Sequence, residues 1–249
     1  MRADAAHETL AGTFGQADWI DTLVSMGPEQ AKGFAQLVNG ILNEGPLPVK
    51  IKHFMLFIIF VAKGYEPLAR AHADAANRAG ATVEEWHEVL AVFLPSRGTM
   101  MYMEGARVLG LDKALTEGAD DSDTAFKRKD EILAYFKKAM GELPGFVRIL
   151  ADKKPTLFEG YFKLRSENLK DAFIPQKYKE LMLVALNTAE RYQTGLEIHA
   201  KAALGCGASQ EEVLDGMTTA ILGGGVPGWI EAAQVYERIC PGQATAKAE

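Results

Sequence analysis

The sequence predicts an all-α protein, and three observations support this fold class. Residues that favour helices, such as alanine, leucine, glutamate and lysine, dominate the stretches between glycines and prolines. The alternation of apolar and polar residues that marks a half-buried strand is hard to find. The chain also repeats itself, because residues 48–98 align with residues 175–225 without a gap. We therefore expect two tandem helical repeats.

The two copies are related by one constant offset, which places position 48 on position 175 and position 98 on position 225. Sixteen of the 51 aligned positions are identical, which is far above chance for an ungapped match. The identical positions include two tyrosines, two histidines and several lysines. They pair Tyr65 with Tyr192, His72 with His199, Lys50 with Lys177 and Lys52 with Lys179. This pattern indicates that a helical unit was duplicated.

Each copy begins with an apolar helix that follows a proline, Pro48 or Pro175. Proline suits the first turn of a helix because its missing N–H would have no intrahelical partner there. In the first copy this helix contains the run FMLFIIFVA at residues 54–62. Nine residues are too few to cross a bilayer, which takes about 20, so we expect a buried helix and no membrane partner.

A second helix in each copy carries the tyrosine and the histidine, and a glycine ends it. Gly80 and Gly207 stand where a left-handed C-terminal cap is expected. The sequences TVEE and SQEE follow, and each places a glutamate three residues after a capping hydroxyl, which predicts the start of a third helix. Gly98, or the run GGGVPG at residues 223–228, then breaks the chain before a last helix.

The domain boundaries follow from these repeats and from a charged segment between them. Residues 116–131, TEGADDSDTAFKRKDE, hold few apolar side chains. We therefore predict a first repeat at residues 18–115, a linker at residues 116–129 and a second repeat at residues 130–240.

Composition narrows the possible partners. The net charge is −6 and the basic residues are scattered, which argues against a nucleic-acid surface. The first residues, MRADAAHETLAG, lack the apolar core of a signal peptide. The two cysteines, Cys206 and Cys240, do not have the spacing of a metal site or a disulfide framework. These features favour a cytoplasmic protein, and no metal site is expected.

Four stretches of the second copy resemble the carboxymuconolactone decarboxylase family, which includes the alkylhydroperoxidase D-like proteins. They are KPTLFEGYFKLRSENL, IPQKYKELMLVALNTA, GLEIHAKAALGCGASQEEV and MTTAILGGGVPGWIEAAQVY. The first copy matches through LPVKIKHFMLFIIFVA and LARAHADAANRAGATVEEWHEVL. The resemblance covers about residues 155–240 and 30–112. It implies an all-helical fold that assembles into homo-oligomers, with a trimer favoured for a duplicated chain.

The peroxidase branch of this family needs a Cys-x-x-Cys pair before the histidine. In this chain Tyr192 and Gly195 occupy those two positions, and Tyr65 and Leu68 occupy them in the first copy. Neither tyrosine nor glycine can replace a thiolate nucleophile. Peroxidase chemistry would then depend on Cys206, for which a role as a small buried residue is the competing interpretation.

The resemblance also implies a proton-handling pair, formed by a glutamate on the first helix of the unit and a histidine on the second, at a fixed spacing. Glu180 and His199 have this spacing, whereas the first copy has His53 and His72. A carboxylate bound to one imidazole nitrogen fixes the tautomer and leaves the other nitrogen for proton transfer. We therefore predict Glu180 and His199 as catalytic residues, with His53 and His72 as weaker counterparts. The competing interpretation is that both pairs only serve packing.

Three further residues of the second copy are candidates for the same site. Tyr192 is seven residues before His199, almost two helical turns, and is a candidate oxyanion donor, with Tyr65 as its counterpart. Gly195 could open space for a substrate, and Arg191 could hold a carboxylate. Core packing and exposure to solvent are the alternatives for these residues.

The sequence thus favours a lyase that needs no cofactor and acts on a small unsaturated lactone acid from aromatic catabolism. The alternatives are a relative that binds a small molecule without turnover, and a thiol-dependent peroxidase that uses Cys206.

Overall fold

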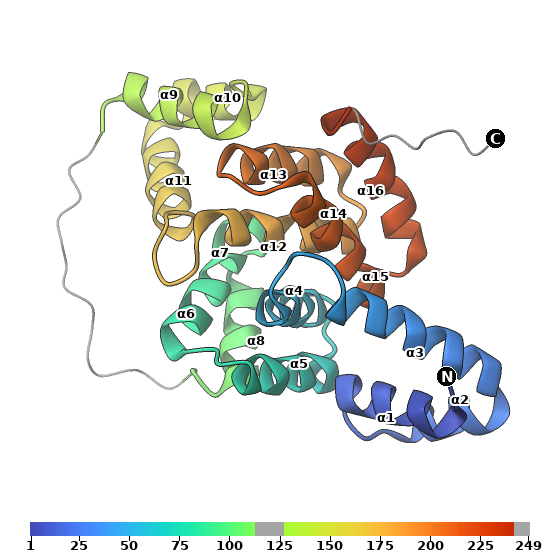
Figure 1. Cartoon of the computed structure of the whole chain (residues 1–249). Helices are drawn as coiled ribbons and strands as arrows, with labels where there is room; N and C mark the ends of the chain where they lie inside the picture. The colour runs from blue at the N-terminus through green and yellow to red at the C-terminus, as the bar shows by residue number, and fades with distance from the viewer. Residues whose placement is uncertain (113–126, 242–249) are drawn as a thin grey trace.

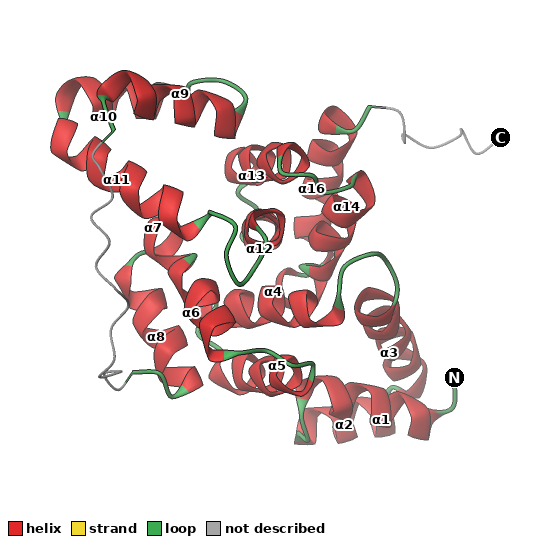
Figure 2. Cartoon of the chain, turned by 60° about the vertical axis from the view of Figure 1, so that its left-hand side comes forward, coloured by secondary structure: helices red, strands yellow, loops and turns green. Residues whose placement is uncertain are grey.

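The computed structural model describes residues 1–112 and 127–241. Within these residues it contains sixteen helices and no strand, which confirms the all-α prediction (Figures 1 and 2). Most of the predicted linker at residues 116–129 lies outside the described residues.

The helices fall into two series of eight. Those of the first half are α1 (Ala3–Phe14), α2 (Asp18–Met26), α3 (Pro28–Asn43), α4 (Val49–Ala62), α5 (Glu66–Arg78), α6 (Val83–Ala91), α7 (Phe93–Arg97) and α8 (Thr99–Leu109). Those of the second half are α9 (Lys129–Met140), α10 (Gly145–Lys153), α11 (Pro155–Asn168), α12 (Gln176–Ala189), α13 (Gln193–Gly205), α14 (Gln210–Thr219), α15 (Ile221–Gly224) and α16 (Val226–Ile239).

The constant offset between the copies extends beyond the segment that the sequence comparison aligned. It maps α2, α4 and α5 onto α10, α12 and α13 with identical bounds. At the N-terminal end, α1 corresponds to α9 within one residue. The predicted first repeat, residues 18–115, therefore leaves out a helix whose counterpart the predicted second repeat, residues 130–240, includes.

The centre of the molecule consists of α4 and α12, which lie next to each other between α5 and α13 (Figures 1 and 2). In α4 every residue from Phe54 to Val61 is buried. A helix that is apolar on all sides has to be covered on all sides, and the other helices provide that cover. The nine-residue apolar run is thus a core helix, and within the described residues no helix has the length and apolar character needed to cross a bilayer.

The local signals at the helix ends are confirmed. Thr82 and Glu85 form a reciprocal capping box at the start of α6, and Ser209 and Glu212 form the equivalent one at α14. After α5 and α13 the chain turns through a glycine with φ of 83° and 87° respectively. These local interactions begin and end the helices that carry the two histidines.

Two buried ion pairs join the repeats, and each repeat supplies one lysine and one carboxylate. The Nζ of Lys52 lies 2.9 Å from Oδ1 of Asp215, and the Nζ of Lys179 lies 3.0 Å from Oε2 of Glu88. Both pairs of aligned positions, 52 with 179 and 88 with 215, are related by the constant offset. The interface therefore has an internal two-fold character, in which the same contact occurs twice in opposite directions.

Three helices of the second repeat form a small apolar cluster of their own. Its buried members come from α9, α10 and α11 and are Ile132, Phe136, Met140, Val147, Ala151, Phe158 and Phe162. In Figure 1 this layer lies beside α13, and α9 contacts α13 directly. It therefore places side chains of α9 and α11 near the histidine that α13 carries.

Candidate functional site

The candidate site is built on the α12–α13 pair of the second repeat. The Nδ1 of His199 lies 2.6 Å from Oε2 of Glu180. A carboxylate only accepts, so His199 donates Nδ1–H and its Nε2 remains for another partner. The Glu180 side chain is 1% exposed and the His199 side chain 14%. Glu180 is thus a buried group that orients a partly exposed imidazole.

Arg165, from α11, reaches the same carboxylate from another side. Its Nη2 lies 3.4 Å from Oε1 of Glu180, and the Arg165 side chain is 4% exposed. Among the residues that the structure describes, the buried Nε of Arg165 has no hydrogen-bond partner. Glu180 therefore lies between the Arg165 guanidinium and the His199 imidazole. The Nε–H of Arg165 is still available to donate a hydrogen bond to a further acceptor.

Two half-buried tyrosines lie within the electrostatic range of this group. Burial is the main cause that raises the pKa of Tyr135 and Tyr161, and the charges of Arg165 and Glu180 act on both phenols in opposite directions. Their rings pack against Phe136, at centroid distances of 5.4 and 5.3 Å. Because a raised pKa keeps a phenol protonated, both hydroxyls remain hydrogen-bond donors at neutral pH.

The corresponding place in the first repeat is closed. Nδ1 of His53 lies 3.1 Å from Nδ1 of His72, and His72 is 0% exposed. Phe60 stacks on the His72 ring and Phe14 of α1 meets its edge. The aligned position of Arg165 is Val38. The structure thus brings the two histidines together as an enclosed pair, with an imidazole at the position of the Glu180 carboxylate and valine at that of Arg165.

Burial also sets the charge of these two histidines. It is the main cause that lowers the pKa of His53 to about 4 and that of His72 to about 3. The positive charge of Arg78 adds to the effect on His53. Both imidazoles are therefore neutral near pH 7, so they can share one hydrogen bond between their Nδ1 atoms.

The tyrosines singled out in the sequence are largely exposed, and within the described residues neither forms a hydrogen bond to the histidine of its helix. Tyr65 and Tyr192 are 51% and 54% exposed, and each is the N-cap residue of its helix, α5 or α13. A Cβ added to Gly195 would lie 2.5 Å from Cδ1 of Tyr192, so the Tyr192 ring occupies the space that the glycine leaves. The space that the missing Cβ of Gly195 leaves is thus occupied by this ring, and a role of Gly195 in substrate access stays a prediction.

Arg191 is also engaged elsewhere. Its Nε donates to Oε1 of Glu231 at 2.6 Å, and its side chain is 59% exposed. Its backbone has φ of 61°, and its counterpart Gly64 has φ of 69°. The expectation that Arg191 holds a carboxylate of the substrate is not supported, because an internal carboxylate already binds it.

The left-handed backbone at position 191 leads to a stability prediction. Arg191→Gly is expected to be more stable than Arg191→Ala by about 1 kcal/mol, because both lose the ion pair but only alanine keeps the Cβ clash. Gly64→Ala should cost a similar amount. Urea unfolding of the three variants measures these differences. Equal stability of the two Arg191 variants would contradict the prediction.

Cys206 is an exposed free thiol at the C-terminal end of α13, and Cys240 is a buried one. Burial of the sulfur and then the negative charge of Glu180 raise the pKa of Cys206 above its ordinary value. A thiol with a raised pKa carries little thiolate at neutral pH. This environment weighs against Cys206 as a peroxide-reducing nucleophile.

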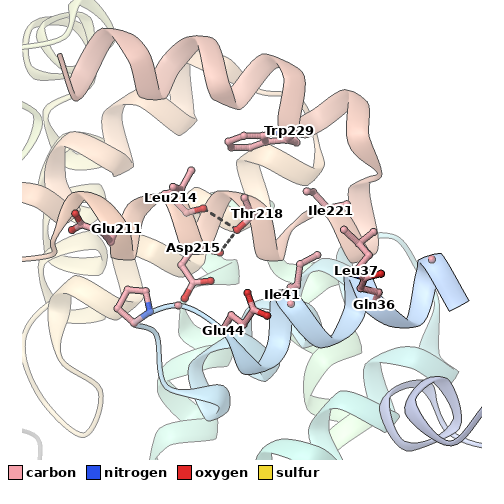
Figure 3. A pocket seen from close by; sticks show the side chains of 14 residues that line it. Gln36, Leu37, Ile41, Glu44, Glu211, Leu214, Asp215, Thr218, Ile221 and Trp229 are labelled. Carbon is pink, nitrogen blue, oxygen red and sulfur yellow. Dashed lines mark hydrogen bonds between the residues drawn. The ribbon is translucent and has the colours of Figure 1, made fainter. Parts of the chain in front are cut away.

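A groove of about 850 Å³ lies away from this site, between α3 of the first repeat and α14 and α16 of the second (Figure 3). Leu37 and Ile41 line one wall, Leu214 another, and Trp229 lies at one side. The carboxylates of Glu44 and Glu211 also line it. Their charge disfavours an anionic ligand, so the groove is a poor place for a lactone acid.

Sequence reasoning missed Arg165, Tyr135 and Tyr161. A signal was present for Arg165, because it follows Phe158 and Phe162 at helical spacing and so lies on the apolar face of α11. A cation in such a position has to find a buried partner. The two tyrosines gave no such signal, because aromatic residues are ordinary on an apolar helix face.

No group of three or more histidine, cysteine, aspartate or glutamate side chains in the described part of the chain is arranged to hold a metal ion.

The second repeat is similar to a known family. Residues 155–238 match the carboxymuconolactone decarboxylase family. This segment holds Arg165, Glu180 and His199, so the match covers the candidate site of the second repeat.

A solved structure shares the fold. A Burkholderia xenovorans protein, provisionally named a gamma-carboxymuconolactone decarboxylase subunit, is 21% identical, with a TM-score of 0.64 over 96% of this chain and 98% of its own. A second protein of that organism, provisionally named a carboxymuconolactone decarboxylase, is 29% identical, with a TM-score of 0.40 over 47% of this chain and 100% of its own. No curated protein matches the chain.

Proposed function

We propose that the protein is a lyase that decarboxylates a small unsaturated lactone acid from aromatic catabolism, with the active site in the second repeat. The observation that carries the proposal is the 2.6 Å contact between Glu180 and Nδ1 of His199, which engages one nitrogen of a partly exposed imidazole and leaves Nε2 for proton transfer. The family match of the same segment supports the substrate class.

The chemistry follows from what this pair can do. The carbon–carbon bond to the leaving carboxylate breaks and releases CO₂, and its electron pair moves into the conjugated lactone carbonyl to give an enolate. Protonated His199 then delivers a proton from Nε2 to carbon and returns to the neutral form. Glu180 stabilises the imidazolium before that transfer and holds the ring in one orientation. Because the lactone carbonyl accepts the electrons, the proposed reaction needs no cofactor.

The first repeat supports the fold rather than the reaction in this proposal. Its His72 is enclosed by aromatic rings and has an imidazole, His53, where the second repeat has a carboxylate. An imidazole whose pKa is lowered by burial is also a poor proton carrier at neutral pH. The active repeat is therefore the one with the accessible histidine.

Loss of the imidazole should abolish most of the activity. His199→Ala is expected to lower kcat by about 100- to 10,000-fold, the usual contribution of a general acid, and Glu180→Gln should lower it by a smaller factor because the ring loses its anchor. The activity of both variants is measured by the release of CO₂ and by the loss of the absorbance of the conjugated lactone substrate. Circular dichroism checks that each variant is folded.

His72→Phe is the matched control, since it changes the aligned histidine of the inactive repeat and should keep most of the activity. Full activity of folded His199→Ala would overturn the proposal. Absence of turnover across unsaturated lactone acids, with binding retained, would favour the alternative of a binding protein. Consumption of hydroperoxide that Cys206→Ser abolishes would favour the peroxidase.

A further inference from the structure

We propose that Arg165 determines the specificity of this site by binding a carboxylate that the substrate keeps, so that each chain takes up one anionic ligand, in its second repeat. This inference rests on the proposed function, because it names the ligand chemistry of the same site.

The guanidinium of Arg165 is buried without enough hydrogen-bond partners among the described residues. Within residues 1–112 and 127–241, its one hydrogen bond is the contact of Nη2 to Glu180 at 3.4 Å, near the upper limit for a hydrogen bond. Its Nε is buried, and no group in the described part of the chain bonds to it. A buried charged donor without an acceptor is costly, and a ligand carboxylate would supply the missing acceptor through a bidentate contact.

Arg97 offers a comparison, because its guanidinium has more hydrogen-bond partners than that of Arg165. It also has a buried Nε without a partner in the described residues, but its Nη2 lies 2.5 Å from Glu190 and 2.9 Å from Asn187, and its Nη1 donates to the carbonyl of Ser96. Arg97 therefore joins structural elements through short contacts. Arg165 lacks such contacts, although it is more deeply buried.

The charge balance of the site points to the same ligand. Glu180 contributes one negative charge, which it shares between Arg165 and His199. When His199 carries the proton that it is to deliver, the three groups sum to one positive charge. A carboxylate on the substrate neutralises that excess, and in a buried site such a match of charge has a large effect on binding.

Two phenols can complete the recognition. In the residues that the structure describes, no hydrogen bond is formed by the hydroxyl of Tyr135 or Tyr161, and both remain protonated donors. Tyr161 precedes Arg165 by four residues on α11, so their side chains share one helix face, and the rings of Tyr161 and Tyr135 both pack against Phe136. They are suited to the neutral oxygens of a lactone, and Arg165 to its carboxylate.

The first repeat keeps the histidine but lacks the arginine, the carboxylate and one of the phenols of this arrangement. Val38 stands at the position of Arg165, Phe34 at that of Tyr161 and His53 at that of Glu180. The duplicated chain should therefore bind one anionic ligand and not two.

The test is a binding measurement that does not depend on turnover. The probe is γ-butyrolactone-γ-carboxylate, a saturated lactone acid that cannot delocalise the electron pair of a lost CO₂, and its methyl ester is the uncharged comparison. Calorimetry of the full chain should give one site and at least about tenfold tighter binding of the acid than of the ester. Arg165→Gln should remove this preference, and Arg97→Gln, the matched control, should keep it.

The outcomes separate this inference from the proposed function. Two equivalents of acid per chain, or equal affinity of the wild type for acid and ester, would overturn the inference, and this wild-type comparison holds even if Arg165→Gln does not fold. A folded Arg165→Gln that keeps the preference would overturn it as well. Binding of the acid through Arg165 without CO₂ release from any unsaturated lactone acid would overturn the proposed function alone.

Discussion

Replacing Lys52 by methionine is expected to lower the free energy of unfolding by about 3–5 kcal/mol, the usual cost of removing one partner of a buried ion pair. Lys52 is 0% exposed, and its Nζ contacts Asp215 at 2.9 Å and the carbonyl of Ile41 at 2.7 Å. The methionine fills a similar volume but leaves the Asp215 carboxylate and the carbonyl without their cation. Most of the loss comes from these stranded acceptors.

The duplicated contact supplies an independent check. Lys179→Met breaks the second pair, in which Glu88 also accepts the backbone N–H of Ile174 as Asp215 accepts that of Leu47. Because both environments are alike, both variants should lose stability by similar amounts. Adding Asp215→Asn to Lys52→Met should cost less than the sum of the single changes, since the two groups interact.

Urea unfolding at neutral pH measures these differences, and Lys50→Met is the matched control. Lys50 pairs with Glu85 within one repeat, and its side chain is 26% exposed. Partly exposed pairs contribute little, so this variant should lose no more than about 1 kcal/mol. If Lys52→Met also lost no more than about 1 kcal/mol, the buried pairs would not hold the repeats together.

Lowering the pH from about 7 to about 5 is expected to remove roughly 2 kcal/mol of stability for each imidazole of the His53–His72 pair. Their pKa values in the folded protein, about 4 and about 3, lie below the ordinary value of 6.5. The unfolded chain therefore binds more protons than the folded one between these values. The stability contribution is complete above pH 6.5 and is lost as the pH falls below it.

The double variant His53→Leu/His72→Phe isolates this effect. It removes both titrating groups from an aromatic environment that suits apolar side chains, and other titrating groups contribute equally to both proteins. The difference in unfolding free energy between the wild type and the variant should therefore change by roughly 3–4 kcal/mol over this pH range. A difference that stays constant with pH would show that the imidazoles are not held in the neutral form.

The candidate site was predictable where it depends on one helix pair. Glu180 and His199 are fixed by the lengths of α12 and α13 and by the short turn between them, and the structure places their side chains in contact. The enclosed state of His72 was not predictable, because it depends on Phe14 of α1, which is far away along the chain. The spacing of residues along one helix does not predict which side chains of a distant helix will cover them.

The candidates around His199 show the same limit. Tyr192 precedes His199 by nearly two turns, but α13 begins only at Gln193. Tyr192 is therefore outside the regular helix, and its ring packs against Gly195. Arg165 belongs to α11, and no sequence pattern near residue 180 predicts its contact with Glu180. Local periodicity places residues on a helix face, whereas the packing of helices decides which faces meet.

By itself the sequence determined that this chain is all helical, that it consists of two copies in one constant register, and where most of the aligned helices begin and end. Helix propensity, capping and apolar periodicity act over a few residues, so they can be read from the chain. Only the tertiary structure decided that one histidine is open and the other enclosed, and that Arg165 joins the first. These properties depend on burial and on charges brought together by packing between distant helices, which local sequence patterns do not encode.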